Sequence, residues 1–415
     1  MTTSSPAPPD PHQTPDVSNA SGSSLVRGRS RWRRWLVRFT FATVVLVAGL
    51  LVARVVLFQG PYQRVEALPS TPLVDWHCHT AGLGAGNSGC FVADRLRTSW
   101  KFDFYLRAFG ATRAEVEEQG DAFVVDRIAA RLQESRHVGQ AVILAMDGVI
   151  DERGELDRAR TEVYVPDEFV ARETARHPNL LFGASVNPRR PDALARLEWA
   201  ATNGAVLVKW IPSIMDIDPA DPRLEAFYRR LVELELPLLT HTGQERSFTG
   251  AHDEYGDPER LELPLRLGVT VIAAHVASTG MIEDEPQFDR LRRMMARHPN
   301  LLSEISSLTQ INKLGYLRDT LKTPEFRGRL LYGTDFPLIN MPLVSPWFFP
   351  LNLTFGQMRE IASIRNPWDR DVRLKQALGV PAGVFAARPM APLQDKLPLL
   401  EVVRDGFGSR LDRRR

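Results

Sequence analysis

The 415-residue sequence predicts an α/β fold: a (β/α)8 TIM barrel preceded by a single N-terminal transmembrane helix. Short apolar runs alternate with charged, helix-like segments, and there are eight such runs, which together predict the barrel. An apolar stretch behind a cluster of arginines predicts the membrane helix. The composition is that of a globular protein, with 25% charged and 44% hydrophobic residues. The net charge of +2 identifies no partner, and we expect no nucleic-acid binding.

The N-terminal segment does not read as part of the barrel. Residues 1–34 are rich in Ser, Pro and Thr and end in arginines, so we expect a disordered, basic segment there. Residues 35–58 are apolar apart from Arg38 and Arg54, and about 20 residues of helix span a bilayer core. Arg54 can extend its charge to the interface. The arginines of this region are Arg27, Arg29, Arg31, Arg33, Arg34 and Arg38.

Three interpretations of residues 35–58 compete. A signal anchor would leave the N-terminus in the cytoplasm and the rest outside it, in the periplasm or extracellular space, because basic residues favour the cytoplasmic side. A cleaved signal peptide has a similar layout, but no convincing small-x-small site follows the run. A buried soluble helix fits least, since the arginines flank only one side. We therefore expect a single-pass membrane anchor.

A linker is expected at 59–70, the barrel at 71–390 and a solvated basic tail at 391–415. Alternating strands and helices imply parallel pairing, and eight strands favour a closed barrel over an open sheet. No Gly-x-Gly-x-x-Gly follows the first strand, which disfavours a dinucleotide-binding fold. The expected strands are 73–77, 140–146, 180–186, 205–210, 236–241, 269–275, 301–305 and 329–335, and the clearest helices are 167–177, 192–202, 223–235, 285–298 and 311–321.

His77-Cys78-His79 closes the first predicted strand. Since side chains alternate along a strand, Asp75, His77 and His79 are expected on one face, with Cys78 turned away. Two imidazoles at this spacing can bind one metal ion. The two cysteines, Cys78 and Cys90, define no disulfide framework, although a single bridge between them stays open.

Other predicted strands also end in polar residues, and the C-terminal ends of barrel strands meet at one face. Three or four imidazoles and a carboxylate are therefore expected in one cavity, a mixture that suits Zn²⁺ or a similar transition metal. Glu304, on the seventh strand, lies either near the mouth or in an ion pair with an arginine. The strand-end residues, each with the neighbour expected to face inward before it, are Lys209 with Leu207, His241 with Leu239, His275 with Ala273, and Asp335 with Gly333.

Five segments in this order resemble the amidohydrolase superfamily, in particular the branch of aminocarboxymuconate-semialdehyde decarboxylase and related metal-dependent hydrolases. The resemblance covers about residues 71–390. The segments are Val-Asp-Trp-His-Cys-His ending at His79, Val-Lys-Trp-Ile-Pro around Lys209, Leu-Thr-His-Thr-Gly around His241, Ala-Ala-His-Val-Ala around His275 and Tyr-Gly-Thr-Asp-Phe-Pro around Asp335.

The resemblance implies a role for each of these residues. His77, His79 and His241 would be metal ligands, and Asp335 would bind the metal or its water and act as general base. His275 would either polarise the substrate carbonyl or bind a second metal. Lys209 would be carboxylated and bridge two metals, or orient a substrate carboxylate, or form a structural ion pair. One or two divalent metals are implied, with Zn²⁺ as the expected ion.

Three functions stay open at this point. A hydrolase would use metal-activated water on an amide, ester or lactone bond of a small molecule. A decarboxylase, a carbon–carbon lyase, would use the same ligands, since the branch that the chain resembles contains both. A barrel that has lost catalysis would serve as a binding module, which the complete ligand set disfavours. The resemblance also makes a homodimer an expectation.

Overall fold

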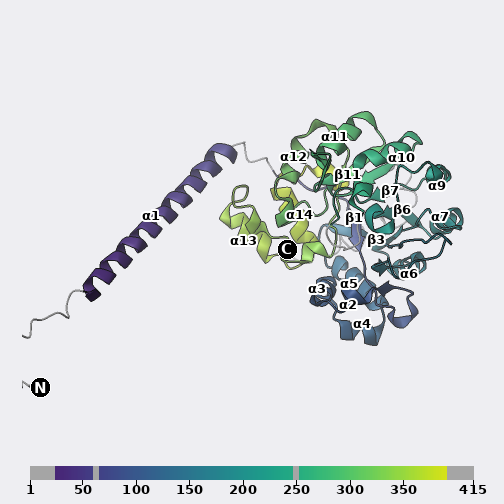
Figure 1. Cartoon of the computed structure of the whole chain (residues 1–415), viewed down its shortest axis with the longest axis horizontal. Coiled ribbons are helices and arrows are strands. Elements are labelled where there is room, and N and C mark those ends of the chain that lie inside the picture. Colours follow the sequence, from purple (N-terminus) through teal and green to yellow (C-terminus); the bar gives the residue numbers. More distant parts are fainter. Residues whose placement is uncertain (1–23, 59–64, 246–251, 390–415) are drawn as a thin grey trace, which may run out of the picture. The chain divides into compact units, whose positions relative to one another are not determined.

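The computed structural model describes residues 24–58, 65–245 and 252–389 (Figure 1). The chain divides into two compact units, Met1–Pro61 and Tyr62–Arg415, which we describe in turn. Within the first unit, residues 1–23 of the predicted disordered segment lie outside the described residues. The predicted tail, 391–415, lies outside them as well.

The first unit contains one long helix, α1 (Ser24–Phe58). It begins inside the segment that we expected to be disordered, where leucine and arginine are good helix formers. Its stretch Trp32–Val52 has a mean hydropathy of 2.1. By length and composition this stretch is sufficient to cross a membrane, and a signal sequence would have the same properties.

The second unit is built on eight parallel strands that close into a barrel. Between the last and first strands, Trp76 N–H donates to the Tyr332 carbonyl at 3.1 Å and Asp335 N–H to the His77 carbonyl at 2.8 Å. The strands follow one another around the sheet in chain order, which confirms the predicted barrel. They are β1 (Leu73–His79), β3 (Val138–Leu144), β5 (Leu180–Ala184), β6 (Ala205–Trp210), β7 (Leu238–Thr240), β8 (Val271–Ala273), β11 (Leu301–Glu304) and β12 (Leu330–Leu331).

Helices surround the strands, as Figure 1 shows. The five predicted helical segments are all found, with shifted ends. The segment expected at 311–321 is broken, because Gly315 takes a φ of +97° and the α-helix starts only after it. The main barrel helices are α5 (Ala122–Gln133), α6 (Asp167–Thr174), α7 (Ala193–Thr202), α9 (Glu225–Glu233), α10 (Glu262–Arg266), α11 (Gln287–Arg297), α12 (Tyr316–Lys322) and α14 (Pro367–Ala377).

Two apolar layers pack on either side of the strands. The larger lies between strands and helices and includes Cys78, which confirms that this thiol turns away from His77; both cysteines are free. The smaller fills the barrel interior, so polar groups gather only where the strands end. It consists of Val74, Trp76, Val142, Leu144, Val206, Leu207, Leu239, Ile272, Ala274 and Leu331.

Long segments follow the first and last strands. After β1 the chain forms a short ribbon, in which β2 (Phe91–Val92) pairs with β4 (Val163–Tyr164), and then α3 (Trp100–Phe109). The buried Asp121 carboxylate holds this segment by accepting hydrogen bonds from the backbone N–H groups of Leu83 and Gly84, at 2.8 and 2.9 Å. After β12 the chain continues to α13 (Phe355–Ser363).

Candidate metal centre

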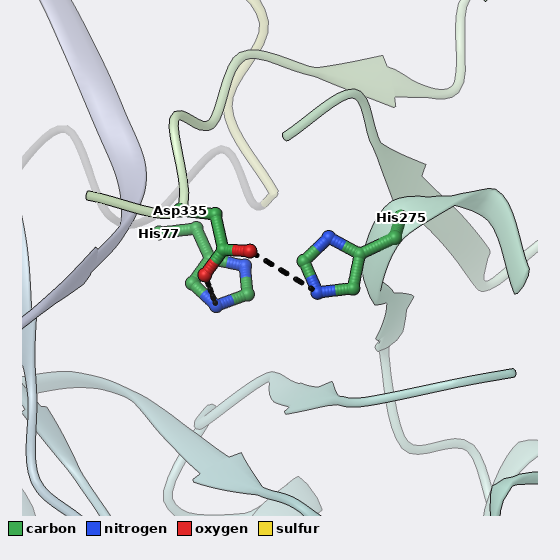
Figure 2. Close-up of side chains that lie close together, drawn as sticks. All are labelled: His77, His275 and Asp335. Atoms are coloured by element: carbon green, nitrogen blue, oxygen red, sulfur yellow. Dashed lines mark ion pairs between the residues drawn. The ribbon is translucent and has the colours of Figure 1, made fainter. Parts of the chain in front are cut away.

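The C-terminal ends of the barrel strands carry the predicted site residues. His77 and His79 lie on β1 and Lys209 lies on β6, whereas the others lie one to four residues after their strands. Figure 2 shows three of these side chains, with the Asp335 carboxylate between the imidazoles of His77 and His275. The residues that follow their strands are His241 after β7, His275 after β8 and Asp335 after β12.

Nitrogen and oxygen atoms of four of these side chains face one another. His77 Nε2 and His79 Nε2 lie 3.1 Å apart, and Asp335 Oδ1 is 3.6 Å from the first and 3.3 Å from the second. The second oxygen, Asp335 Oδ2, is 3.8 Å from His275 Nε2 (Figure 2). His77, His275 and Asp335 each offer one ligand atom within 4.8 Å of the others. The spacing is that of groups that can share one ion.

Strand β1 does not alternate as the sequence predicts. The register with β3 shifts between Asp75 and Cys78, and Trp76 packs in the barrel interior. Asp75 faces α14 instead, where its carboxylate accepts hydrogen bonds from Trp368 Nε1 at 2.9 Å and Thr334 Oγ1 at 2.6 Å. The prediction that Asp75 shares a face with His77 is therefore wrong, because an irregularity in the strand resets the alternation.

The side chains from Ala273 to His275 also depart from the simple inward–outward alternation of a strand. Ala273, expected to face inward, packs in the outer layer, whereas Ala274 packs inside the barrel. His275 reaches the cluster because its backbone turns left-handed, with φ 57°, and Val276 and Ala277 continue that turn. Such a conformation costs a non-glycine residue on the order of 1–2 kcal/mol, and it is found mostly at functional sites.

The other residues that were predicted to face the barrel interior do so. Leu207 and Leu239 point into the barrel, as expected before Lys209 and His241. Gly333 also faces inward, since a Cβ on it would lie 3.1 Å from the His77 Cβ. Asp335 has a φ of 59°, so the aspartate too occupies the left-handed region.

Glu304 at the end of β11 proves to belong to the site. Among the described residues its ion-pair partners are His77 and His275 rather than an arginine. Its Oε1 lies 3.1 Å from His77 Nδ1. A carboxylate only accepts, so Nδ1 of His77 carries the proton and its Nε2 lone pair points toward Asp335.

Burial sets the charges of the cluster. It lowers the pKa of His77 to about 4, with the charge of Lys209 acting in the same direction. Burial likewise lowers the pKa values of His241 and, further, of His275. It would raise the pKa of Asp335, but the charges of His275 and His77 lower that pKa well below its ordinary value. Neutral imidazoles and an ionised carboxylate are the forms that bind a metal.

Lys209 lies beside this group, with Nζ 3.3 Å from His77 Nε2. The side chain is buried, and that burial lowers its pKa to about 8. A neutral amine is thus accessible near neutral pH, which carboxylation requires, while the ammonium form would attract a substrate carboxylate. The position is compatible with both roles that the sequence leaves open.

His241 packs against His275 with ring centroids 5.2 Å apart, but among the described residues it is not one of the three whose ligand atoms lie within 4.8 Å of one another. Its Nε2 is buried without a hydrogen-bond partner among the described residues; the nearest carboxylate oxygen, from Glu245, is 3.6 Å away. Buried polar atoms are normally paired, so a nitrogen of this kind fits a cluster that holds an ion. The donor set suits a divalent transition metal.

The family model described as amidohydrolase matches residues 74–363, more than half of the sequence. The chain belongs to the amidohydrolase family. Enzymes of this superfamily are metal-dependent, which agrees with the His77, His275 and Asp335 cluster. The resemblance seen in the sequence is thereby confirmed. A search of curated proteins found no relative of this amidohydrolase.

Among solved structures, this amidohydrolase is similar to an uncharacterised TIM-barrel protein from Bordetella bronchiseptica, with 18% identity over 74% of this chain and 99% of that one and a TM-score of 0.45. It is similar to 5-carboxyvanillate decarboxylase from Sphingomonas paucimobilis, with 14% identity, coverage of 77% and 100%, and a TM-score of 0.41. It is also similar to a putative 2-pyrone-4,6-dicarboxylic acid hydrolase from Pseudomonas putida. That comparison gives 13% identity over 75% of this chain and 100% of the other, with a TM-score of 0.41. Likenesses this distant do not bear on the reaction.

Proposed function

We propose that this amidohydrolase is a metal-dependent hydrolase of a small molecule, cleaving an amide, ester or lactone bond. The observation that supports it is the convergence of His77 Nε2, His79 Nε2 and Asp335 Oδ1 within 3.1–3.6 Å. A divalent metal, Zn²⁺ in our expectation, held by His77, His79, His241 and Asp335, would supply a Lewis acid that lowers the pKa of a water toward about 7.

Asp335 would act as the general base. Its carboxylate is ionised at neutral pH, because the neighbouring imidazoles lower its pKa well below the ordinary value against the effect of burial. It can therefore accept the proton of the attacking water at one oxygen and later deliver it to the leaving group. The side chain is only 11% exposed, which keeps bulk water from competing for that proton.

His275 would assist at the substrate oxygen. Its Nε2 faces Asp335 Oδ2 at 3.8 Å, so the proton that Asp335 accepts can pass through this ring on its way to the leaving group. The resulting imidazolium would donate to the developing oxyanion. The neutral ring could instead hold a second metal, in which case a carboxylated Lys209 would bridge the two.

Lys209 favours one alternative reaction. Its Nζ lies 3.3 Å from His77 Nε2, where an ammonium group would orient a substrate carboxylate beside the metal ligands. In a decarboxylase, the ionised Asp335 would take a proton from water and pass it to the carbon from which CO₂ departs. Both reactions use the same residues, and only the products separate them.

The test is a product assay with purified, Zn²⁺-loaded protein. Aryl esters, lactones and anilides are compared with aromatic carboxylates, and released alcohol or amine is measured alongside released CO₂. We expect alcohol or amine without CO₂, and loss of that activity in Asp335→Asn. Release of CO₂ alone would contradict the hydrolase and support the decarboxylase.

We further propose that α1 is a signal anchor, which places the barrel on the extracytoplasmic side of a membrane. The apolar stretch Trp32–Val52 and the arginines that precede it support this orientation. Alkaline extraction of membranes tests it: the full-length chain should stay in the membrane pellet, and complete release would rule out the anchor.

A further inference from the structure

Glu304 is a carboxylate without any exposed surface, at the end of β11. Its Oε1 lies 3.1 Å from His77 Nδ1 and accepts a hydrogen bond from the His275 backbone N–H at 3.0 Å. The Ser306 hydroxyl donates to the same oxygen at 2.8 Å, and the Ser306 backbone N–H donates to Oε2. Every one of these donors belongs to the wall of the metal cluster or to the turn that supports it.

The Ser306 hydroxyl extends this network to a second imidazole. Because it gives its only proton to Glu304, its oxygen is left to accept, and His275 Nδ1 lies 2.7 Å from it. The Ser306 carbonyl oxygen, another acceptor, is 3.4 Å from the same Nδ1, and the Ser307 hydroxyl, which can also accept, is 3.1 Å from it. Nδ1 of His275 therefore carries the proton, as Nδ1 of His77 does.

Gly333 on the neighbouring chain segment makes room for the network. A Cβ there would lie 2.7 Å from Glu304 Oε2 and 3.3 Å from the Ser306 Cβ. Only glycine leaves the carboxylate in this position without a shift of its neighbours. The rings of His77 and His275 stack beside it, with centroids 5.1 Å apart.

We propose that Glu304 is a positioning residue that fixes two imidazoles at once: His77 directly and His275 through the Ser306 hydroxyl. It holds both rings in the Nδ1–H tautomer, so that both Nε2 lone pairs point at Asp335. The inference rests on the proposed metal function, because two aligned lone pairs serve to bind and activate at an ion.

Two variants and a matched control separate the direct contact of Glu304 with His77 from its contact with His275 through the Ser306 hydroxyl. Glu304→Gln removes the charge and replaces one acceptor by an amide donor, so its single oxygen cannot accept from both His77 Nδ1–H and the Ser306 backbone N–H. Ser306→Ala breaks only the contact with His275. Ser303→Ala is the control, since Ser303 lies on the same strand, is equally buried and donates to the Ala273 carbonyl, outside the network.

Tautomers are read from ¹⁵N chemical shifts of histidine in the metal-free protein, and Zn²⁺ affinity from competition with a chelator. We expect the Nδ1–H signature at His77 and His275 in the wild type and its loss at His77 in Glu304→Gln. In Ser306→Ala we expect a smaller share of it at His275 alone, because the Ser306 carbonyl oxygen and the Ser307 hydroxyl can still accept from Nδ1. Zn²⁺ affinity should fall about 10–100-fold in Glu304→Gln. Ser303→Ala should match the wild type in both measurements.

The histidine tautomers and the Zn²⁺ affinity together distinguish a failure of the proposed function from a failure of the inference about Glu304. If the wild type binds no Zn²⁺, the proposed function fails, whereas the tautomers still decide the role of Glu304. If Glu304→Gln keeps both tautomers and the wild-type affinity, the inference is overturned. Should Glu304→Gln not fold, an unchanged His275 tautomer in Ser306→Ala would overturn it as well.

Discussion

Two buried carboxylates lie on either side of His77, and they differ in everything except burial. Asp75 accepts hydrogen bonds from neutral donors, Trp368 Nε1, the Thr334 hydroxyl and the His77 backbone N–H. Glu304 faces the imidazoles of His77 and His275. The first fastens β1 to β12 and α14, while the second faces the metal cluster.

Their pKa values diverge accordingly. Burial raises the pKa of Asp75 to about 7, because neutral donors offset only part of the cost of a buried charge. Burial acts on Glu304 in the same direction, but its hydrogen bond to His77 and the charges of His77 and His275 lower its pKa well below the ordinary value. Burial alone therefore does not define a site; the partners decide whether a buried carboxylate supports the fold or the chemistry.

Substitution on the cluster side should cost activity and spare the fold. For Asp335→Asn we expect kcat/KM to fall about a thousandfold, because the general base is lost. The metal-free variant should stay folded but lose some stability at neutral pH, because the Asp335 carboxylate ionises more readily in the folded chain than in the unfolded one. Steady-state kinetics measure the change in kcat/KM, and urea unfolding measures the change in stability. Equal activity in the variant would mean that Asp335 takes no part in the reaction.

The contributions of the two buried carboxylates to the free energy of unfolding should change with pH in opposite directions. The contribution of Asp75 is present below its ordinary pKa of 3.8 and is lost as pH rises through about 7. Relative to Asp75→Asn, the metal-free wild type should lose about 4 kcal/mol over that window.

Glu304 should behave in the reverse way. Its contribution is present above its ordinary pKa of 4.5 and is lost as pH falls below it, so the wild type should lose stability relative to Glu304→Gln on acidification. Urea unfolding from about pH 2 to pH 8 covers both windows and gives both difference curves. Two curves of the same slope would refute the contrast.

Removing the Asp75 carboxylate altogether should destabilise the barrel. Asp75→Ala leaves Trp368 Nε1 and the Thr334 hydroxyl buried without their acceptor, so we expect a loss of about 3 kcal/mol at pH 5. Asp75→Asn keeps an acceptor and should lose less. Thermal and urea unfolding test this, and an alanine variant as stable as the wild type would show that the contacts contribute nothing.

The smallest effect concerns the Thr334 hydroxyl, which donates to Asp75 at 2.6 Å and accepts from the Phe336 N–H at 3.1 Å. Thr334→Val should lose about 2 kcal/mol, since both partners are buried. Thr334→Ser keeps the hydroxyl and serves as the control. Because Thr334→Val keeps the methyl group and loses only the hydroxyl, a valine variant as stable as the wild type would show that the hydroxyl contributes nothing.

Much of the barrel could be predicted because its signals are local and repeated. Eight apolar runs have the order that the sheet has, and the polar residues that end them meet at one face. Leu207 and Leu239 point inward as a two-residue period requires. The predicted ligands therefore gather without any long-range information beyond parallel pairing.

The misplacements come from backbone irregularities that no side-chain pattern announces. The register shift after Asp75 turns that carboxylate to the opposite side from His77, and the left-handed turn at His275 puts Ala273 in the outer layer. Glu304 was ambiguous because its partners, His77 and His275, are far away in the sequence. Only the closed barrel brings them together.

Metal analysis of the purified full-length protein tests the central claim most directly. After loading with Zn²⁺ and removal of excess ion, we predict about one metal per chain in the wild type and close to none in a folded His77→Ala variant. A ratio near two would indicate the bridged pair with Lys209. No bound metal in the wild type, or equal metal in both proteins, would contradict the site described at the ends of β1, β7 and β12.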